Sequence, residues 1–296
     1  MSSPEKPRIG FIGLGVMGSR IAARLLAAGY AVTGFNRTVE KAADLVDRGM
    51  QLAPAPRQSA EGADVVFTMV SDADALFAVT TGPDGVLQGL RPGADFVDLS
   101  TVGPGASEEL CALVGSQGGH FLAAPVSGSV STIEAGQLSF MVGGDGHALE
   151  TVRGVLEDIG SGGITYIGTP PQASAMKLAL NLSVSVQVTA FCEGILLAER
   201  FGISREDAVN TFLKSVVASP MLAYRGRFLL DPPEEAWFTI ALARKDLRLT
   251  LQMADSVRLP LFSAANVSQL LAAGEGMGFG GAELAAVADV LQAMSS

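Results

Sequence analysis

Lys177 is the side chain in this sequence that is best suited to acid–base chemistry. It lies near the start of a long apolar segment, and Asn181 follows it at i+4, the spacing of neighbours on one face of a helix. A lysine removed from water has a lowered pKa and can exchange a proton with a carbonyl or alcohol oxygen. Asn181 can then orient the ammonium group or bind a substrate. A lysine that extends its ammonium group into solvent fits the same spacing, so both roles stay open.

The pattern G-x-G-x-x-G begins at Gly13, between a short apolar segment and a helical one. Gly13 permits a tight turn, Gly15 lets the backbone approach a pyrophosphate, and Gly18 lets the helix pack closely on the strand. The amides at the helix N-terminus attract phosphate charge. A tight turn without a ligand fits the bare pattern, but the strand–loop–helix context favours a dinucleotide site. The loop residues are Gly13, Leu14, Gly15, Val16, Met17 and Gly18.

Arg37 stands where sites that prefer NAD usually carry an acidic residue, about 20 residues after the glycine loop. Its guanidinium group can bind a 2′-phosphate, and Asn36 and Thr38 add polar contacts. An exposed arginine without a ligand is the plainer alternative. Our interpretation is that the chain binds NADP(H).

Residues 124–129, Ala-Pro-Val-Ser-Gly-Ser, form a turn of small residues after a predicted strand. The hydroxyl groups and amides of Ser127, Gly128 and Ser129 can surround a carboxylate in the manner of an anion-binding nest. Loops rich in Pro, Ser and Gly are also common without any ligand. Composition alone favours the loop without a ligand.

The composition of the chain excludes several other classes of protein. It has 20 Lys and Arg against 30 Asp and Glu, whereas a nucleic-acid binder needs a basic surface. Its 2 Cys and 2 His residues do not make a disulfide framework or a histidine-rich metal site. We expect structural or surface roles for His120 and His147, with no metal and no nucleic-acid partner.

We expect a soluble, cytoplasmic protein. The residues before the first apolar segment lack the apolar core of a signal peptide. The segment 173–198 is long and apolar, but Lys177, Asn181, Gln187 and Glu193 interrupt it, and charged groups are costly inside a membrane. A buried helix with no membrane partner is the better interpretation.

Two kinds of pattern divide the chain. Up to residue 168, short apolar segments alternate with helical ones, which is typical of a parallel sheet covered by helices on both faces. After residue 168 the patterns are helical. We therefore expect a nucleotide-binding α/β domain over 1–168 and an all-helical domain over 169–296. The expected strands are 8–13, 31–36, 64–70, 95–99, 119–124 and 137–143; the main expected helices are 17–28, 73–79, 106–116, 146–159, 173–200, 204–213, 238–256, 262–273 and 283–294.

The order of these motifs resembles that of the β-hydroxyacid dehydrogenases, the family that contains 3-hydroxyisobutyrate dehydrogenase and the glyoxylate/succinic semialdehyde reductases. The match extends over nearly the whole chain, and Asn-Arg-Thr, Ser-Gly-Ser and Gly-Gln-Leu look most like the NADPH-dependent reductases. The matching motifs are Gly10-Phe-Ile-Gly-Leu-Gly-Val-Met-Gly18, Asn36-Arg-Thr38, Asp98-Leu-Ser-Thr101, Ala124-Pro-Val-Ser-Gly-Ser129, Glu134-Ala-Gly-Gln-Leu138, Lys177-x-x-x-Asn181 and Lys245-Asp-Leu247.

The resemblance implies a Rossmann domain with a doubly wound, mostly parallel sheet, a long interdomain helix over 173–200, and an all-α C-terminal domain. It also implies a homodimer or homotetramer. The residue roles it implies are a catalytic Lys177 with Asn181 beside it, a substrate carboxylate held by Ser127 and Gly128, Thr101 near nicotinamide and substrate, Met69 and Val70 along the cofactor, and Lys245 reaching over the cofactor.

Three regions depart from the family pattern. Ala123 replaces an acidic residue before Ala-Pro-Val-Ser-Gly, and Pro171 and Ala173 replace the glycines that normally precede the lysine helix. The usual C-terminal glycine-then-aspartate turn reads Gly278-Phe-Gly-Gly-Ala-Glu283. These changes keep Lys177 but put the shape of the substrate site in question. A rigid Pro171 can also change how the helix enters that site.

The expected reaction is the reduction of a small aldehyde or 2-oxo carboxylic acid to the hydroxy acid, with hydride from NADPH and a proton from Lys177. An imine reductase is one alternative, because it shares the architecture but usually replaces the lysine. A non-catalytic NADPH-binding regulator is another. The presence of both Lys177 and Lys245 favours the reductase.

Overall fold

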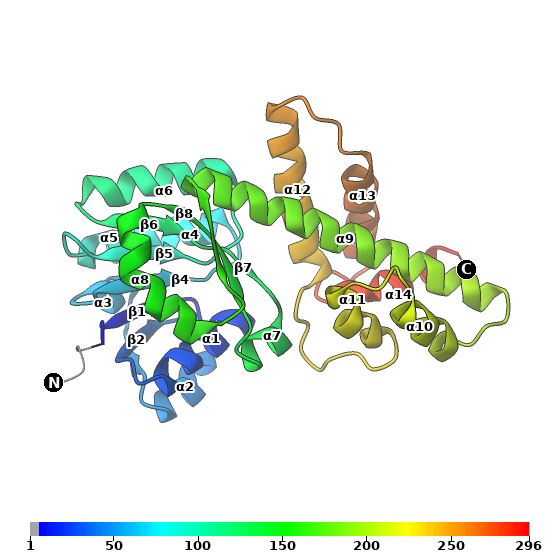
Figure 1. The fold of residues 1–296 in the computed structure, drawn as a ribbon, viewed down its shortest axis with the longest axis horizontal. Helices are drawn as coiled ribbons and strands as arrows, with labels where there is room; N and C mark the ends of the chain where they lie inside the picture. Colours follow the sequence, from blue (N-terminus) through cyan, green and yellow to red (C-terminus); the bar gives the residue numbers. More distant parts are fainter. Residues whose placement is uncertain (1–5, 296) are drawn as a thin grey trace. The chain divides into compact units, whose positions relative to one another are not determined.

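The computed structural model describes residues 6–295. Its contacts divide the chain into two compact units, Met1–Lys177 and Leu178–Ser296. The first unit is an α/β domain and the second is helical (Figure 1). Helix α9 (Pro170–Arg200) belongs to both, so the division falls inside this helix, directly after Lys177.

A single sheet forms the centre of the first unit. Its strands in the described residues are β1 (Ile9–Ile12), β2 (Val32–Phe35), β3 (Gln51–Leu52), β4 (Val65–Thr68), β5 (Asp95–Asp98), β6 (His120–Ala123), β7 (Val126–Ser127), β8 (Ser139–Gly144) and β9 (Ile164–Gly168). The order is β3-β2-β1-β4-β5-β6-β8-β7, and β9 also pairs with β8. Strands β1 to β6 are parallel, whereas β8 runs antiparallel to β6 and β7. The order 3-2-1-4-5-6 is that of doubly wound dinucleotide-binding folds.

Helices cover both faces of this sheet (Figure 1). They are α1 (Val16–Ala27), α2 (Ala43–Asp47), α3 (Pro56–Ala60), α4 (Ala73–Thr81), α5 (Val86–Gly89), α6 (Pro104–Ser116), α7 (Val130–Glu134) and α8 (Gly146–Ile159). Because successive side chains of a strand alternate between faces, Phe67 packs in the core beneath α1 and α8 while Val66 packs in the core beneath α3 to α6. Burial on both faces explains the continuous apolar strands in the sequence.

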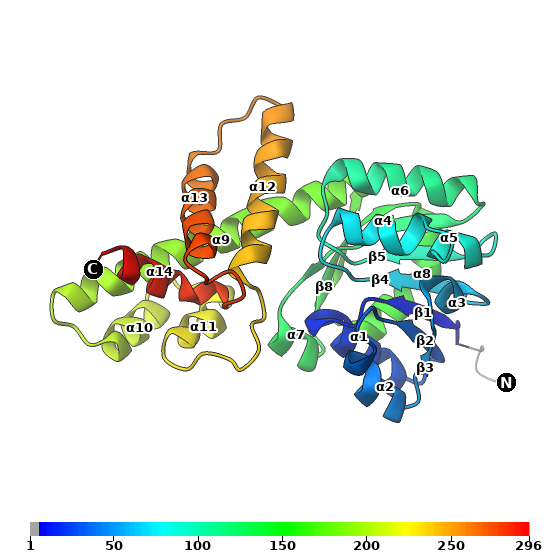
Figure 2. The ribbon, with the colours of Figure 1, turned by 180° about the vertical axis from the view of Figure 1, so that it is seen from behind.

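The second unit consists of helices around a separate apolar core. With the second part of α9 they are α10 (Arg205–Lys214), α11 (Pro220–Arg225), α12 (Ile240–Ser256), α13 (Phe262–Gly276) and α14 (Val287–Met294), with short 3-10 turns at Gly226–Leu229 and Leu284–Ala286. Helices α12 and α13 lie side by side (Figure 2). By length and composition α9 is a candidate membrane span, with 39% of its apolar window buried in the protein. A buried core helix passes the same test, so the expected absence of a membrane partner stays a prediction.

The expected fold class is confirmed: a mostly parallel α/β sheet, a long helix and a helical C-terminal part. Strands β3, β7 and β9 were not predicted. Strands β3 and β7 have two residues each, too few for a detectable alternation. Helix α9 begins at Pro170 rather than at the expected 173.

The start of α9 explains why Pro171 is compatible with this helix. Pro171 lies in the first turn, where a missing amide proton breaks no helical hydrogen bond. The side-chain oxygen of Gln172 accepts hydrogen bonds from the amide and the hydroxyl of Thr169, at 2.8 and 3.1 Å, which caps the helix. Ala173 is fully buried, and its methyl group fits because Gly143 of β8 has no side chain: a Cβ there would lie 3.0 Å away.

Gly10→Ala should lower the melting temperature of the protein. The added carbon would lie 2.3 Å from the backbone oxygen of Ser59, and overpacking of this kind costs about 1–3 kcal/mol. The matched control is Gly154→Ala in α8, where the added carbon meets no described atom within 4 Å and alanine is favoured by roughly 0.5–1 kcal/mol. Thermal unfolding followed by circular dichroism measures both variants. Equal melting temperatures would contradict the packing described for Gly10.

Candidate functional site

The strand order reverses between β1 and β4, and the loops that follow these two strands touch. A Cβ on Gly13, after β1, would lie 2.2 Å from the backbone oxygen of Met69 and 3.1 Å from the side chain of Val70, both after β4. In open α/β sheets, ligands bind outside the carboxyl ends of the strands at such a reversal. The structure therefore brings the predicted cofactor residues Gly13, Met69 and Val70 together at the appropriate edge.

The glycine loop has the geometry that its sequence predicts at two of three positions. Gly13 has φ +98°, a conformation that side chains disfavour, and its amide donates to the oxygen of Phe35 at 2.9 Å. A Cβ on Gly18 would lie 2.0 Å from the oxygen of Gly13, so α1 can pack on β1 only with glycine there. These two glycines are required by the protein itself.

Gly15 is different, because nothing in the described protein requires a glycine there. Its φ of −76° is ordinary, and a Cβ on it would meet no described atom within 4 Å. Gly15 is the N-cap residue of α1, and no side chain accepts a hydrogen bond from the first amides of this helix at that position. These amides can therefore donate to an external acceptor. Close approach of a phosphate to the backbone accounts for glycine at this position.

Asn36 braces the glycine loop. Its side-chain oxygen accepts the amide of Leu14 at 2.9 Å, and its side-chain nitrogen donates to the oxygen of Thr38 at 2.8 Å. Leu14 itself is buried in the core, so it supports the loop through its side chain and this amide. Arg37 and Thr38 are exposed directly after β2, at the position predicted for the 2′-phosphate group.

A buried carboxylate ties the loop after β4 to the loop after β5. Asp98 accepts hydrogen bonds from the hydroxyl of Thr68 at 2.7 Å and from the amide of Ser100 at 3.1 Å. The hydroxyl of Ser100 in turn accepts the amide of Val70 at 3.0 Å. Thr101 follows directly and is half-buried. The positioning roles of Asp98 and Ser100 were not predicted from the sequence, although both residues belong to the same motif as Thr101.

The turn at 127–129 leaves from the same edge of the sheet. The amide of Ala124, at the end of β6, donates to the oxygen of Asp98 at 2.7 Å. Ser127 is half-buried, whereas Gly128 is exposed and has φ +140°. Ser129 is buried, and its hydroxyl lies 3.0 Å from that of Ser131. Ser127 and Gly128 are thus the accessible residues of this turn, whereas the buried Ser129 contacts only other residues of the protein.

Lys177 is held by the packing of the first turns of α9. The hydroxyl groups of Ser174 and Ser107 are buried 2.5 Å apart, which joins α9 to α6. Lys177 lies one turn further on, half-buried, and belongs to the same compact unit as the glycine loop, Thr101 and Ser127. The first unit therefore contains the predicted proton donor, the predicted carboxylate turn and most of the predicted cofactor residues.

In the second unit, the carboxylate of Asp246 contacts two predicted site residues. Asn181, on α9, donates its side-chain amide to Asp246 at 2.5 Å, and the ammonium nitrogen of Lys245 lies 3.0 Å from the same carboxylate. Asp246 is 2% exposed and Asn181 is 7% exposed. The sequence contained Asp246 within Lys245-Asp-Leu247, but without the fold nothing indicated that it would contact Asn181.

Neither histidine lies beside the glycine loop of the first unit. His120 is 3.0 Å from the carboxylate of Asp95 at the amino ends of β5 and β6, and burial raises the pKa of Asp95 while His120 opposes that shift. His147 is in the first turn of α8, whose N-cap Asp145 has a pKa lowered by hydrogen bonds from the amides of Ala148 and His147. In the described residues no three His, Cys, Asp or Glu side chains form a cluster that could hold a metal ion.

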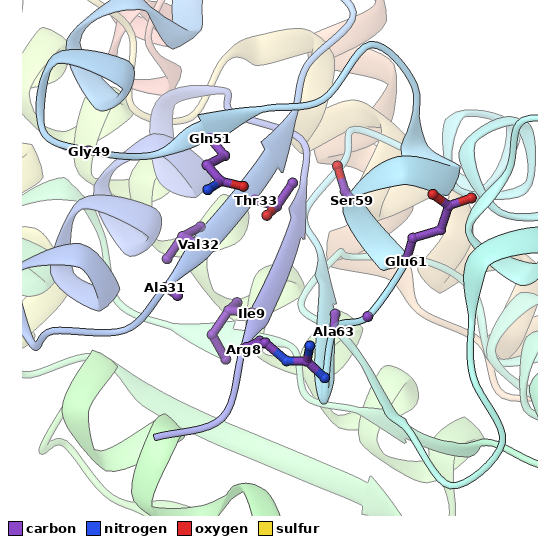
Figure 3. Close-up of a pocket in the computed structure, with 11 residues that line it drawn as sticks. Arg8, Ile9, Ala31, Val32, Thr33, Gly49, Gln51, Ser59, Glu61 and Ala63 are labelled. Carbon is purple, nitrogen blue, oxygen red and sulfur yellow. The ribbon is translucent and has the colours of Figure 1, made fainter. Parts of the chain in front are cut away.

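Two cavities lie elsewhere. One of about 310 Å³ is at the amino ends of β1 and β2, opposite the glycine loop, with Arg8, Thr33, Gln51, Ser59 and Glu61 among its lining residues (Figure 3). The other, of about 480 Å³, is within the helical unit. No predicted site residue lines either cavity, so the candidate site rests on the residues described above.

Two family models match successive parts of the chain. Residues 8–168 match the NAD binding domain of 6-phosphogluconate dehydrogenase, which is more than half of the chain. Residues 172–291 match the model described as "NAD-binding of NADP-dependent 3-hydroxyisobutyrate dehydrogenase". The two matches meet near the start of α9.

Individual relatives cover most of the chain. Glyoxylate/succinic semialdehyde reductase 2, chloroplastic, of Arabidopsis thaliana is 32% identical over 288 residues, which are 97% of this chain and 80% of that protein. Cytokine-like nuclear factor N-PAC of Danio rerio is 34% identical over 266 residues, but this chain spans only 58% of its length. The solved structure of Psf3 in complex with NADP+ and 2-OPP has a TM-score of 0.88 and 29% identity, and covers 96% of this chain and 99% of that one.

Gly15→Ala and Gly18→Ala should separate ligand binding from folding. Gly15→Ala should lower the melting temperature much less than Gly18→Ala, because the added carbon meets no described atom within 4 Å and only the weaker preference for alanine at an N-cap opposes it. It should weaken dinucleotide binding roughly 5- to 100-fold, the equivalent of about 1–3 kcal/mol of overpacking against the ligand. Gly18→Ala should lose stability, because its added carbon would lie 2.0 Å from the oxygen of Gly13.

Thermal unfolding and calorimetric titration with NADPH and NADH measure these two effects. Wild-type affinity in Gly15→Ala would contradict the placement of a dinucleotide at this loop.

Proposed function

Because the chain belongs to the 3-hydroxyisobutyrate dehydrogenase-like β-hydroxyacid dehydrogenases, we propose that it reduces a small aldehyde or 2-oxo carboxylic acid with NADPH. Membership makes it an NAD(P)-dependent oxidoreductase; the cofactor preference, substrate class and direction are our proposal. The observation that carries it is Lys177, which is held at the start of α9 in the same unit as the glycine loop, Thr101 and Ser127.

The residues of the first unit fit a dinucleotide with a 2′-phosphate. Gly15 leaves room for a pyrophosphate at the N-terminus of α1, and Arg37 and Thr38 are exposed at the end of β2 without an acidic neighbour before Glu40. Arginine binds phosphate through two parallel hydrogen bonds. Bound NADPH would supply the hydride for the reduction. The NADP+ named with the structure of Psf3 supports this choice of cofactor.

Lys177 is the proposed proton donor. Its ammonium group would give a proton to the carbonyl oxygen as that oxygen gains negative charge, and would stabilise this charge before the transfer is complete. In the reverse direction, a neutral Lys177 would accept the proton from the alcohol. Asn181 lies one turn along α9 from Lys177, and the contact of Asn181 with Asp246 fixes the orientation of its amide.

Ser127 and Gly128 are the proposed anchor for the substrate carboxylate. The hydroxyl and amides of this accessible turn can donate to a carboxylate, as in other backbone nests. A fixed carboxylate sets the distance from the anchor to the reacting carbonyl, so orientation contributes to the rate. The name of the Arabidopsis relative supports a short carbonyl acid of the glyoxylate or semialdehyde type.

NADPH oxidation over a panel of carbonyl compounds tests the proposed function. The panel contains glyoxylate, succinic semialdehyde, tartronate semialdehyde, methylmalonate semialdehyde and cyclic imines. Turnover of cyclic imines alone would replace the proposal with an imine reductase. NADPH binding without turnover of any compound would instead support a non-catalytic regulator, an outcome to which the N-PAC relatives give weight.

We also propose that the protein is cytoplasmic and forms a homodimer or a homotetramer. Light scattering of the purified protein measures the mass of the assembly and so tests the proposed number of subunits.

Lys177→Ala should lower kcat by about 10²–10⁴-fold, the usual contribution of a positioned general acid, while NADPH binding stays at the wild-type level. The matched control is Lys214→Ala, which removes an exposed lysine from the last turn of α10. Steady-state kinetics and NADPH titration distinguish the two effects. Near-normal turnover in Lys177→Ala would remove the assigned proton donor.

Arg37→Gln should raise the KM for NADPH roughly 10- to 100-fold and leave the KM for NADH almost unchanged, because a hydrogen bond to a charged group contributes about 1.5–3 kcal/mol. Arg48→Gln is the control, since Arg48 is an exposed residue of the same unit that pairs with Asp44. Equal use of NADH and NADPH by the wild-type protein would contradict the 2′-phosphate assignment.

A further inference from the structure

Glu283 is a buried carboxylate that holds the segment leading into α12. It is 7% exposed, and it accepts the backbone amides of Trp237 and Phe238 at 2.8 and 3.0 Å. Its other oxygen accepts a hydrogen bond from the guanidinium group of Arg225, which is 4% exposed. The three donors come from α11 and from the residues before α12, so one side chain joins three segments that are distant in sequence.

The backbone around Glu283 continues the same contact. The first amides of α12, those of Ile240 and Ala241, donate to the oxygens of Ala282 and Gly280, each at 3.0 Å. The amide of Leu284 donates back to the oxygen of Phe238 at 2.9 Å. The first amides of a helix have no partner within the helix, so the turn 280–284 acts as the cap that these amides need.

Helix α12 carries Lys245 and Asp246, about one and a half turns after its start. Asp246 meets Asn181 of α9 at 2.5 Å, a distance that tolerates little displacement. Because α12 is one continuous helix, the anchoring of its first residues contributes to the position of the Asp246 carboxylate. The anchor at Glu283 is therefore connected to the polar cluster of Asn181, Lys245 and Asp246.

We propose that Glu283 is a positioning residue, which anchors the start of α12 so that Lys245 and Asp246 meet Asn181 in a geometry that supports turnover. The ion pair with Arg225 does not by itself account for a buried carboxylate at this position. Buried ion pairs are poor stabilisers, and the Nε atom of Arg225 has no hydrogen-bond partner in the described protein. Two of the three donors to Glu283 are instead amides of the segment that enters α12.

A pair of double variants isolates the anchor from the ion pair. Arg225→Met/Glu283→Gln and Arg225→Met/Glu283→Met both remove the two buried charges, so neither leaves an unpaired one. They differ in one respect: glutamine keeps a side-chain oxygen that can accept the amides of Trp237 and Phe238, and methionine does not. Comparing them measures the anchor at constant charge and similar volume.

The first measurement is the turnover of NADPH with a carbonyl substrate, and it rests on the proposed function. We expect kcat of the Met/Met variant to fall about tenfold or more below that of the Met/Gln variant, because displacements of the order of an ångström can cost up to about 10²-fold. Calorimetric NADPH affinity should be the same in both. Equal kcat values in two folded variants would overturn the positioning role, since a merely structural residue changes the melting temperature and not the turnover of the folded protein.

Trp237 gives a second readout that needs no turnover. It is the single tryptophan of the chain, and the centroid of its ring lies 4.8 Å from the centroid of the Phe228 ring. Loss of the anchor should change its emission maximum and raise its quenching by acrylamide in the Met/Met variant only. Hydrogen exchange should also become faster over residues 237–246. Unchanged emission and exchange would overturn the proposal even if the wild-type protein reduces no carbonyl compound, an outcome that would refute the proposed function separately.

Glu275→Gln, on α13, is the matched control, because it weakens a different contact of α12. It removes the partly exposed pair between Glu275 and Arg244 of α12 but leaves the turn at Glu283 intact. We expect wild-type turnover and wild-type Trp237 emission. A loss of kcat equal to that of the Met/Met variant would mean that any weakened contact of α12 lowers turnover, which would overturn a specific role for Glu283.

Discussion

The contact between Gly18 and the backbone oxygen of Gly13 is the constraint on which the first unit depends. A Cβ on Gly18 would lie 2.0 Å from that oxygen, so the helix can approach the strand only without a side chain. This approach sets the direction in which α1 leaves β1 and aims its N-terminal amides along the edge of the sheet. Gly13 in turn lies against Met69, so the loop after β4 is placed by the same backbone.

Buried carboxylates also hold segments together, through hydrogen bonds to their side chains. Asp98 joins the loops after β4 and β5, Asp246 joins α12 to Asn181, and Glu283 joins α12 to the C-terminal turn. Each is less than a tenth exposed, so an unpaired oxygen would be costly and the partners are held firmly. Hydrogen bonds to these buried carboxylates thus fix the positions of loops and helices that are distant in the sequence.

The sequence was sufficient for features that depend on local pattern. The alternating elements, the glycine loop and the long helix with Lys177 are all encoded within windows of a few turns, and the fold class followed from them. It was insufficient where the partner is remote. Asn36 was predicted to contact the cofactor, but its hydrogen bond with the backbone amide of Leu14, one strand earlier, could not be predicted from the Asn-Arg-Thr motif. The contact of Asp246 with Asn181 bridges 65 positions and could not be read from either motif.

The departures from the family pattern fall mainly on this framework, and neighbouring residues accommodate them. Pro171 fits because Thr169 and Gln172 cap the helix, and Ala173 fits because Gly143 leaves space. Ala123 is buried in the apolar core under α3 to α6, where an acidic side chain would need a partner. Since the proposed proton donor Lys177 and the proposed carboxylate anchor at Ser127 and Gly128 are unaltered, the changes concern the residues that support them. On the proposed function, the substrate preference of this family member would therefore depend on the residues that support the site, with Lys177 kept as the proton donor.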